Sequence, residues 1–165
     1  MTEKKGKLDS TEALRAATSS MCAIGGTALG VSFFCRSIGA LQFHEAEMVN
    51  ISTPVEEIAE VLSRDSIGAI LVVDRHGKLS GLITETDFIK KVTPRISEYG
   101  HLVAGDIMTQ DPVAEEPTVT IALALTLMSH GGFRHLPLVD GERHPIGVIT
   151  VKDIIDAIVQ EVVGV

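Results

Sequence analysis

The segment Gly81-Leu-Ile-Thr84-Glu-Thr-Asp87 returns 66 residues later as Gly147-Val-Ile-Thr150-Val-Lys-Asp153. At the same offset Val73-Asp74 matches Val139-Asp140. A run of matches at one fixed offset indicates a single supersecondary unit that is used twice. We expect two copies of so short a unit to pack face to face and bury a shared core. The cleft between them is then the first place to look for a binding site.

The composition narrows the class of protein. The chain has 165 residues, of which 45% are hydrophobic, and its formal net charge is −8. This hydrophobic content suffices for a packed globular core. Acidic charge and the absence of Trp weigh against nucleic-acid binding, which needs clustered Lys and Arg or exposed aromatic rings. Because Cys22 and Cys35 lack CxxC spacing, we expect reduced thiols and a cytoplasmic protein.

The N-terminal part differs from the rest of the chain. Residues 21–34 form the one long apolar run, which is too short to span a bilayer. A signal peptide is an alternative because Lys4, Lys5 and Lys7 lie upstream, but acidic residues interrupt that segment and no clean A-x-A site follows. We favour a buried helix or a contact between subunits, with no membrane association. Since nothing in residues 1–38 recurs later, we predict a partly helical appendage there.

Helix signals recur in both copies. Thr53-Pro54-Val55-Glu56 is typical of a helix start with a capping box. An apolar face follows at helical spacing on Val55, Ile58, Ala59 and Leu62, and it is repeated on Ile121, Ala124, Leu125 and Met128. A second helix is expected over 84–92, with its counterpart over 150–163. The first of these should end at Thr93-Pro94, because the residue before proline disfavours helical conformation.

Strand signals recur in the same way. Short β-branched runs flank turn residues at 69–73 and 78–83, and again at 136–139 and 146–149. If first strands lie near Val49 and Val113, each copy is a β-α-β-β-α unit. The fold class is then α/β (α+β), with pseudo-two-fold symmetry between the copies. We therefore predict an appendage over 1–38, one repeat over 39–98 and another over 99–165, with the linker at 94–103.

The repeated motif places three chemically useful residues at a strand-to-helix junction. Gly81 has no Cβ, so a ligand can approach the strand closely. The Thr84 hydroxyl and the free amides of the first helical turn can face an anionic group. Asp87 can accept two hydrogen bonds from a vicinal diol such as ribose. The alternative is structural, because Thr-x-x-Asp is also close to a capping box that only satisfies helix amides.

Residues 39–165 resemble a tandem pair of cystathionine-β-synthase (CBS) domains, the arrangement called a Bateman module. Besides the repeated motif, the segments that carry the resemblance are Ile67-Gly-Ala-Ile-Leu-Val-Val-Asp74, Gly105-Asp-Ile-Met108 and Phe133-Arg-His-Leu-Pro137. It implies clefts between the copies that bind AMP, ADP, ATP or S-adenosylmethionine as regulatory ligands, with no required cofactor. It also implies a homodimer. The first copy departs from the family pattern because Glu45-Ala-Glu-Met48 is inserted before its first strand.

The resemblance also implies roles for individual residues. The aspartates would hold the ribose, the threonines of the motif would lie near ribose or phosphate, and residues before the first helix of each copy would line the adenine pocket. The resulting candidates are Gly81, Thr84, Asp87, Gly147, Thr150, Asp153, Thr53 and Thr120. The second copy adds Arg134, His135 and Lys152. A phosphorylated ligand is therefore expected at the cleft served by Arg134 or Lys152, although a solvated surface arginine is an equal alternative for Arg134.

These observations predict a stand-alone regulatory module that binds an adenosine ligand between its repeats and signals to an unidentified partner protein. The alternative is a ligand-free structural or dimerisation module in which Asp87 and Asp153 only cap helices. The sequence contains no catalytic constellation and no phosphate loop of the G-x-x-x-x-G-K type, so we expect no enzymatic activity. The six histidines lack metal-ligand spacing, which argues against a metal site.

Overall fold

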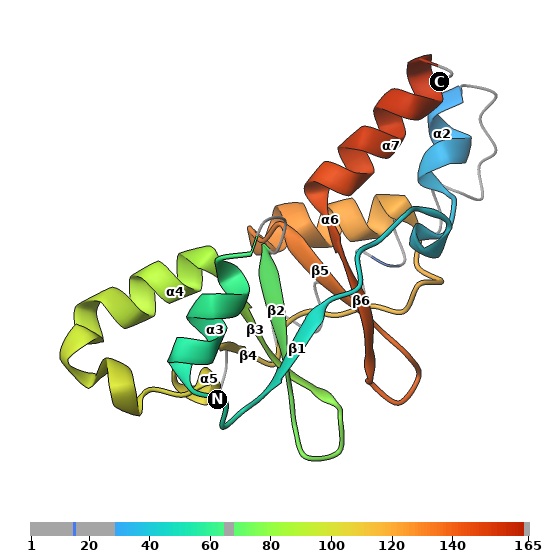
Figure 1. Ribbon diagram of the computed structural model, residues 1–165. Coiled ribbons are helices and arrows are strands. Elements are labelled where there is room, and N and C mark those ends of the chain that lie inside the picture. Colours follow the sequence, from blue (N-terminus) through green and yellow to red (C-terminus); the bar gives the residue numbers. More distant parts are fainter. Residues whose placement is uncertain (1–14, 16–28, 65–67, 164–165) are drawn as a thin grey trace. The chain divides into compact units, whose positions relative to one another are not determined.

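The computed structural model describes residue 15, residues 29–64 and residues 68–163 (Figure 1). In chain order its elements are α2 (Leu29–Phe34), η1 (Ile38–Ala40), β1 (Glu47–Asn50), α3 (Val55–Leu62), β2 (Ala69–Val73), β3 (Leu79–Thr84), α4 (Glu85–Val92), η2 (Thr93–His101), α5 (Ala104–Ile107), β4 (Thr109–Gln110), α6 (Ile121–Gly131), β5 (His135–Val139), β6 (Pro145–Thr150) and α7 (Val151–Val163). The strands and helices predicted around both copies of the motif are thereby confirmed.

The chain divides into two compact units. The first unit contains the described parts of residues 1–43, together with 115–136 and the described parts of 149–165. The second unit contains residues 44–114 and 137–148. The paired strands β5 and β6 pass from one unit into the other, so the tip of the β5–β6 hairpin belongs to the second unit.

A four-stranded sheet forms the centre of the second unit, with strand order β1-β2-β3-β4. β1 runs parallel to β2, and the remaining neighbours are antiparallel. The β2–β3 turn is fixed by Asp74, whose Oδ1 accepts hydrogen bonds from the amides of His76 (2.8 Å) and Lys78 (3.0 Å). Side chains that bond neighbouring amides in this way favour a tight turn over continued strand. The predicted hairpin is confirmed.

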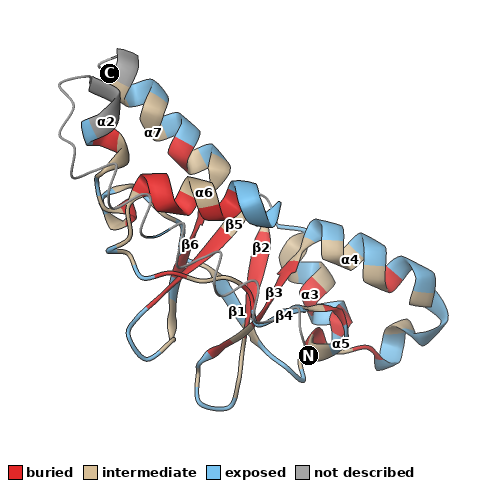
Figure 2. Ribbon diagram, turned by 180° about the vertical axis from the view of Figure 1, so that it is seen from behind, coloured by how far each residue is buried: buried red, intermediate tan, exposed pale blue. Residues whose placement is uncertain are grey.

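Strand β2 supplies two apolar clusters because its successive side chains point to opposite faces. Ile70 and Val72 pack in a cluster that includes Val55 and Ile58 of α3. On the other face the cluster consists of Ala69, Leu71, Leu79, Leu82, Val139 and Val148. Figure 2 shows this burial in red along β2 and β3. Side chains from both copies therefore share one core within the second unit.

The start of α3 differs from its prediction. Val55 and Ile58 are fully buried, which confirms the apolar face. The predicted capping box is wrong, because Pro54 is the N-cap and provides no side-chain hydrogen bond. Thr53 then lies one residue too early to reach the helix amides. Its hydroxyl instead accepts from the Asn50 amide at 3.1 Å and closes the turn after β1.

Two further predictions need correction around the linker. Helix α4 ends at Val92 as expected, but the predicted linker forms the 3-10 helix η2. The first strand of the second copy, expected near Val113, is reduced to a single bridge residue at Glu115. The strand β4 lies before it, covers only Thr109 and Gln110, and pairs with β3. It stops there because Asp111 takes a left-handed backbone conformation with φ 46°, which turns the chain out of the ladder.

Helix α6 organises the first unit. Thr120 is its N-cap and accepts a hydrogen bond from the Leu123 amide at 3.2 Å, and Gly132 ends it with φ 66°. Left-handed backbone at this position favours glycine because glycine has no Cβ. The predicted face is largely confirmed, since Ile121, Ala124 and Met128 are at most 2% exposed.

The appendage is described only from α2 onward, apart from Arg15, so most of the segment predicted to be partly helical lies outside the described residues. Cys35 is disulfide-bonded, and the prediction of a reduced thiol there is wrong. The lack of CxxC spacing did not predict this bond, because a disulfide depends on the distance between the two Cβ atoms in the fold. The other cysteine of the chain, Cys22, lies outside the described residues. Among the described helices none combines the length and hydropathy needed to cross a membrane.

Candidate ligand-binding site

In the first copy the repeated motif lies at the junction of β3 and α4. Thr84 ends the strand and is the N-cap of α4, and Asp87 occupies the third helical position. Thr84 Oγ1 accepts from the Asp87 amide at 3.3 Å. Asp87 Oδ2 accepts from the Thr84 amide at 3.2 Å and from its hydroxyl at 2.7 Å. The capping box that was the structural alternative for this motif is therefore present.

The second copy repeats this arrangement where β6 meets α7. Asp153 Oδ2 accepts from the Thr150 amide at 2.7 Å and from the Thr150 hydroxyl at 2.8 Å. Thr150 Oγ1 in turn accepts from the Asp153 amide at 3.2 Å. In both copies the motif thus fixes the first turn of its helix through one carboxylate oxygen. A ligand that hydrogen-bonds to the aspartate must therefore contact the other carboxylate oxygen or displace one of the capping hydrogen bonds.

The second oxygen of Asp87 has partners of its own. Asp87 Oδ1 lies 3.0 Å from the Lys91 ammonium and accepts from the Thr109 hydroxyl at 3.2 Å. Lys91 also donates to the carbonyls of Ile107 (2.7 Å) and Met108 (3.1 Å). Burial alone would raise the pKa of the Asp87 carboxyl, but the hydrogen bonds from Thr84 and Lys91 and the charge of Lys91 together lower the pKa below its ordinary value.

Gly81 is in close contact with a side chain. A Cβ placed on Gly81 would lie 2.3 Å from Met108 Sδ and 2.9 Å from Met108 Cγ. Ordinary carbon contacts are about 3.5–4.0 Å. Met108 therefore occupies the space that a side chain at residue 81 would need.

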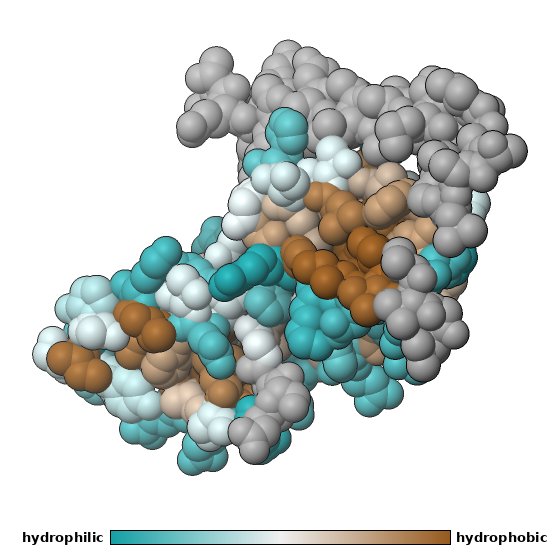
Figure 3. Space-filling view, turned by 90° about the horizontal axis from the view of Figure 1, so that it is seen from above, coloured by the Kyte–Doolittle hydropathy of each residue, from teal (hydrophilic) through white to brown (hydrophobic). Residues whose placement is uncertain are grey.

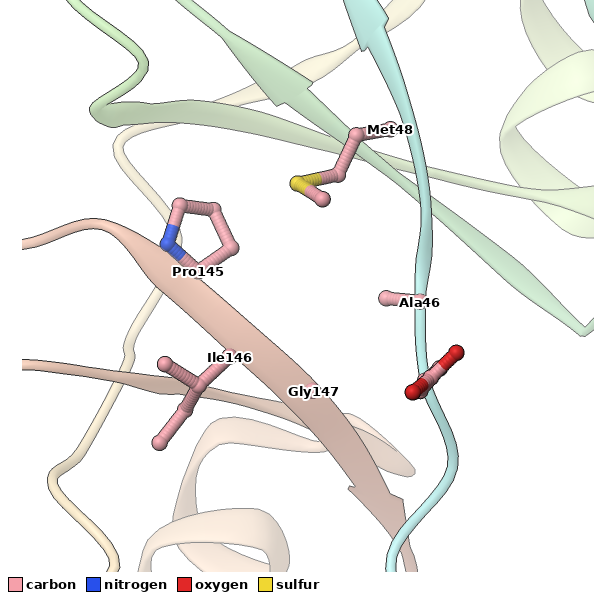
Figure 4. A pocket seen from close by; sticks show the side chains of 6 residues that line it. Ala46, Met48, Pro145, Ile146 and Gly147 are labelled. Atoms are coloured by element: carbon pink, nitrogen blue, oxygen red, sulfur yellow. The ribbon is translucent and has the colours of Figure 1, made fainter.

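A pocket of about 230 Å³ adjoins the motif glycine of the second copy. Its lining residues are Glu45, Ala46, Met48, Pro145, Ile146 and Gly147, all within the second unit. Figure 4 shows Met48 on β1 pointing toward Pro145 on β6, with Ala46 facing the same strand. A small cavity with apolar walls and a single carboxylate can accept a flat, weakly polar group such as a heterocyclic base.

The predicted cations of the second copy lie in the first unit, in different environments. Lys152 is 81% exposed and pairs with Asp156 at 2.5 Å. The hydrogen bond and charge of Asp156 raise the pKa of Lys152. Arg134 has an exposed side chain, and its carbonyl accepts from the Val151 amide at 3.1 Å, beside the start of α7. His135 follows in β5 and is half-buried. Arg134 is thus better placed than Lys152 to offer an uncommitted positive charge.

The remaining candidates have identifiable structural roles. Thr120 caps α6, and Thr53 closes the turn after β1 through its hydroxyl. The structure brings Gly81, Thr84 and Asp87 together in the second unit, along with Thr53 and Gly147. It places Thr120, Arg134, His135, Thr150, Lys152 and Asp153 in the first unit.

Five lining residues of the pocket were not among the predicted site residues: Glu45, Ala46, Met48, Pro145 and Ile146. The sequence offers a signal for the first three, because the segment 45–48 departs from the family pattern as an insertion before the first strand. Pro145 and Ile146 directly precede the motif glycine. Across the described part of the chain, no group of three or more His, Cys, Asp or Glu side chains is arranged to hold a metal ion.

Comparison with solved structures supports this fold. The chain is similar to CBSX2 from Arabidopsis thaliana, solved in complex with AMP, with a TM-score of 0.65, 25% identity, and coverage of 76% of this chain and 97% of that chain. It is also similar to the CBS domain pair of protein MJ0100, in complex with 5-methylthioadenosine and S-adenosyl-L-methionine, with a TM-score of 0.67, 23% identity, and coverage of 77% and 98%.

Curated relatives share part of their length with this chain. An uncharacterised protein of Methanopyrus kandleri is 33% identical over 99 residues, which are 60% of this chain and 50% of that protein. The mitochondrial CBS domain-containing protein CBSX3 of Arabidopsis thaliana is 27% identical over 65% of this chain and 53% of its own length. The chain thus spans about half the length of these relatives. The sequence profile of the CBS domain matches residues 40–93 and 104–160, so the chain belongs to the CBS domain family as a tandem pair.

Proposed function

We propose that this chain is a non-catalytic regulatory module that binds an adenosine ligand at the Gly147–Asp153 motif and passes its binding state to a partner protein. The observation that carries the proposal is the pocket at Gly147, where the motif glycine lines a cavity of about 230 Å³. Whole small-molecule sites are typically about 300–1,000 Å³. This cavity therefore suits the base of a nucleoside.

The polar groups at the start of α7 are suited to a ribose and a phosphate. Asp153 would accept hydrogen bonds from the ribose hydroxyls, and Thr150 with the first-turn amides would face a phosphate or a similar polar group. The exposed Arg134 supplies positive charge directly before β5, which begins at His135. Lys152 is engaged by Asp156 and contributes less. The hydroxyls of Thr53 and Thr120 are already committed, so contacts there would come from the main chain.

The relatives support the class of ligand. CBSX2, which is 25% identical to this chain, was solved in complex with AMP. We therefore propose an adenosine ligand for this chain as well. The MJ0100 pair, at 23% identity, supports the fold alone. AMP, ADP, ATP and S-adenosylmethionine remain the candidates. The single carboxylate of the pocket, on Glu45, disfavours a polyphosphate near the base.

The second candidate function is a ligand-free dimerisation module. It is favoured by the capping bonds, which give Asp87 and Asp153 a structural role in both copies. Apolar side chains at the surface also stand out in brown in Figure 3. Ile89 on α4 is 64% exposed, and its counterpart Ile155 on α7 is 51% exposed. We propose that these helices meet those of a second copy, under either function.

A thermal-shift series with AMP, ADP, ATP and S-adenosylmethionine tests the proposal. A ligand at 100 times its dissociation constant stabilises by about 2.7 kcal/mol, which raises the melting temperature by several degrees. The matched variant is Asp153→Asn, since its amide oxygen keeps a cap acceptor while the charge is lost. A selective shift in the wild type, absent in Asp153→Asn, is expected. Equal melting curves with all four ligands would favour the ligand-free module.

The disulfide at Cys35 bears on the cellular compartment. Because Cys35 is disulfide-bonded, the cysteines give no support to a reducing compartment, and the expected cytoplasmic location loses its main argument.

A further inference from the structure

We propose that the pocket at Gly147 selects its base through Glu45: it accepts a purine with an amino group at position 6 and disfavours a purine with an oxo group there. The inference rests on the proposed function above, because it concerns which base the same pocket holds. All six lining residues belong to the second unit, so the groups that select the base lie within one compact unit.

The pocket forms where two paired segments separate. His44 and Val148 exchange two main-chain hydrogen bonds, in which each amide donates to the other residue's carbonyl at 3.1 and 3.0 Å. In an antiparallel ladder the next pair to exchange such bonds lies two residues further along each segment, here Ala46 and Ile146. No main-chain hydrogen bond joins these two described residues, and both line the pocket. The cavity therefore lies where the next rung of the ladder would be (Figure 4).

The open edge of β6 offers a donor and an acceptor to a ligand. Successive residues of an extended strand direct their main-chain groups to opposite edges, so those of Ile146 lie on the same edge as those of Val148. Because Val148 uses both its amide and its carbonyl on His44, that edge faces the segment before β1. A planar group with a donor beside an acceptor can bond to Ile146 as a neighbouring strand would.

Glu45 adds a carboxylate that has no partner in the described part of the chain. The residue is exposed and lines the pocket. It forms no hydrogen bond or ion pair there, whereas Glu47, two positions further on, pairs with Arg64 at 3.6 Å. A carboxylate can only accept hydrogen bonds. Together with the Ile146 carbonyl, Glu45 gives the pocket more acceptors than donors.

This surplus of acceptors distinguishes between purine bases. Adenine carries an amino group at position 6 beside a ring nitrogen that accepts, so it can donate to Glu45 while its ring nitrogen accepts from a main-chain amide. Hypoxanthine has a carbonyl oxygen at position 6, which would face the carboxylate with no proton between them. A site that bonds a donor rejects an analogue without that donor, because its own acceptors are left unpaired. The apolar walls, Met48 and Pro145 among them, pack against either ring and do not discriminate.

Calorimetric titration of AMP and of inosine monophosphate (IMP) into the full chain tests the inference. The measured quantity is the ratio of the two affinities, in which any effect of Glu45 on the shared phosphate cancels. The wild type should bind AMP at least about tenfold more tightly than IMP, as expected for one charge-assisted hydrogen bond. Glu45→Gln should reduce this preference to within about threefold, since an amide donates as well as accepts.

The matched control is Glu47→Gln, which removes a carboxylate that does not line the pocket and should keep the wild-type ratio. Because both glutamates are exposed, both variants should fold like the wild type. A preference for AMP that is unchanged in Glu45→Gln would overturn the inference. Equal affinity of the wild type for AMP and IMP, or no binding of AMP, would also overturn it.

S-adenosylmethionine, titrated in parallel, separates this result from the proposed function. Binding of AMP or of S-adenosylmethionine, with no effect of Glu45 on the ratio between AMP and IMP, would retain the proposed function and reject only the selection by Glu45. No binding of any adenosine ligand would reject both.

Discussion

Replacing Gly81 by alanine should test the packing of Met108 most sharply. The new Cβ would meet Met108 Sδ at 2.3 Å, Cγ at 2.9 Å and Cβ at 3.0 Å, so the Met108 side chain must retreat. Forcing an extra methyl group into a packed site costs about 1–3 kcal/mol. Alanine recovers about 0.5–1 kcal/mol, because glycine loses more conformational freedom on folding. We expect a net loss of about 1–2 kcal/mol in the free energy of unfolding.

The assay is urea denaturation of four proteins: wild type, Gly81→Ala, Met108→Ala and the double variant. A loss of 1 kcal/mol corresponds to about 2–4 °C in melting temperature for a chain of this size. In the Met108→Ala background only the contact with Cβ of residue 108 at 3.0 Å remains, so Gly81→Ala should be much less destabilising there. If Gly81→Ala is equally destabilising in both backgrounds, the close contact with Met108 does not explain the glycine.

Three further predictions follow from the described contacts. Thr120→Ala should lower the free energy of unfolding by about 1 kcal/mol, because α6 loses its N-cap. Thr53→Ala should lower it by less, since Thr53 only closes a turn, and urea denaturation that gave the reverse order would contradict this. Lys91→Met should destabilise by about 1 kcal/mol near neutral pH, and this difference should shrink in acid to the part contributed by the bonds to the Ile107 and Met108 carbonyls. The pKa of Asp87 is lowered in the folded state, so the stabilisation from the Asp87 carboxylate is present above its unfolded pKa and lost as the pH falls through its folded pKa. A difference of the same size at neutral and acid pH would show that Lys91 acts without Asp87. Ile155→Asp should shift the protein toward monomer in sedimentation experiments if α7 contributes to a dimer, and an unchanged mass would place any dimer contact elsewhere.

The repeat made much of the fold predictable. β2, β3, α4 and α6 carry their own periodicity, turn residues and caps, so local sequence was sufficient for them. The possible capping role of Thr84 and Asp87 was also visible, because it depends on residues three apart.

The features that the sequence did not predict depend on contacts between distant residues or on the backbone conformation of single residues. Lys91 bonds carbonyls 16 and 17 residues away, and no local pattern shows that pairing. The end of β4 depends on the backbone conformation of Asp111. Because Pro54 is the N-cap of α3, Thr53 lies outside that helix and does not cap it. The disulfide at Cys35 likewise depends on where the fold places the Cβ atoms.

The central claim is that the second copy of the motif binds an adenosine ligand. Calorimetric titration of AMP and of S-adenosylmethionine into the wild type and Asp153→Asn tests it most directly. The account predicts saturable binding of one of the two to the wild type, weakened at least about tenfold in a folded Asp153→Asn protein, as expected for the loss of a charge-assisted hydrogen bond. Binding of equal strength to both proteins, or no binding of either ligand to the wild type, would contradict it.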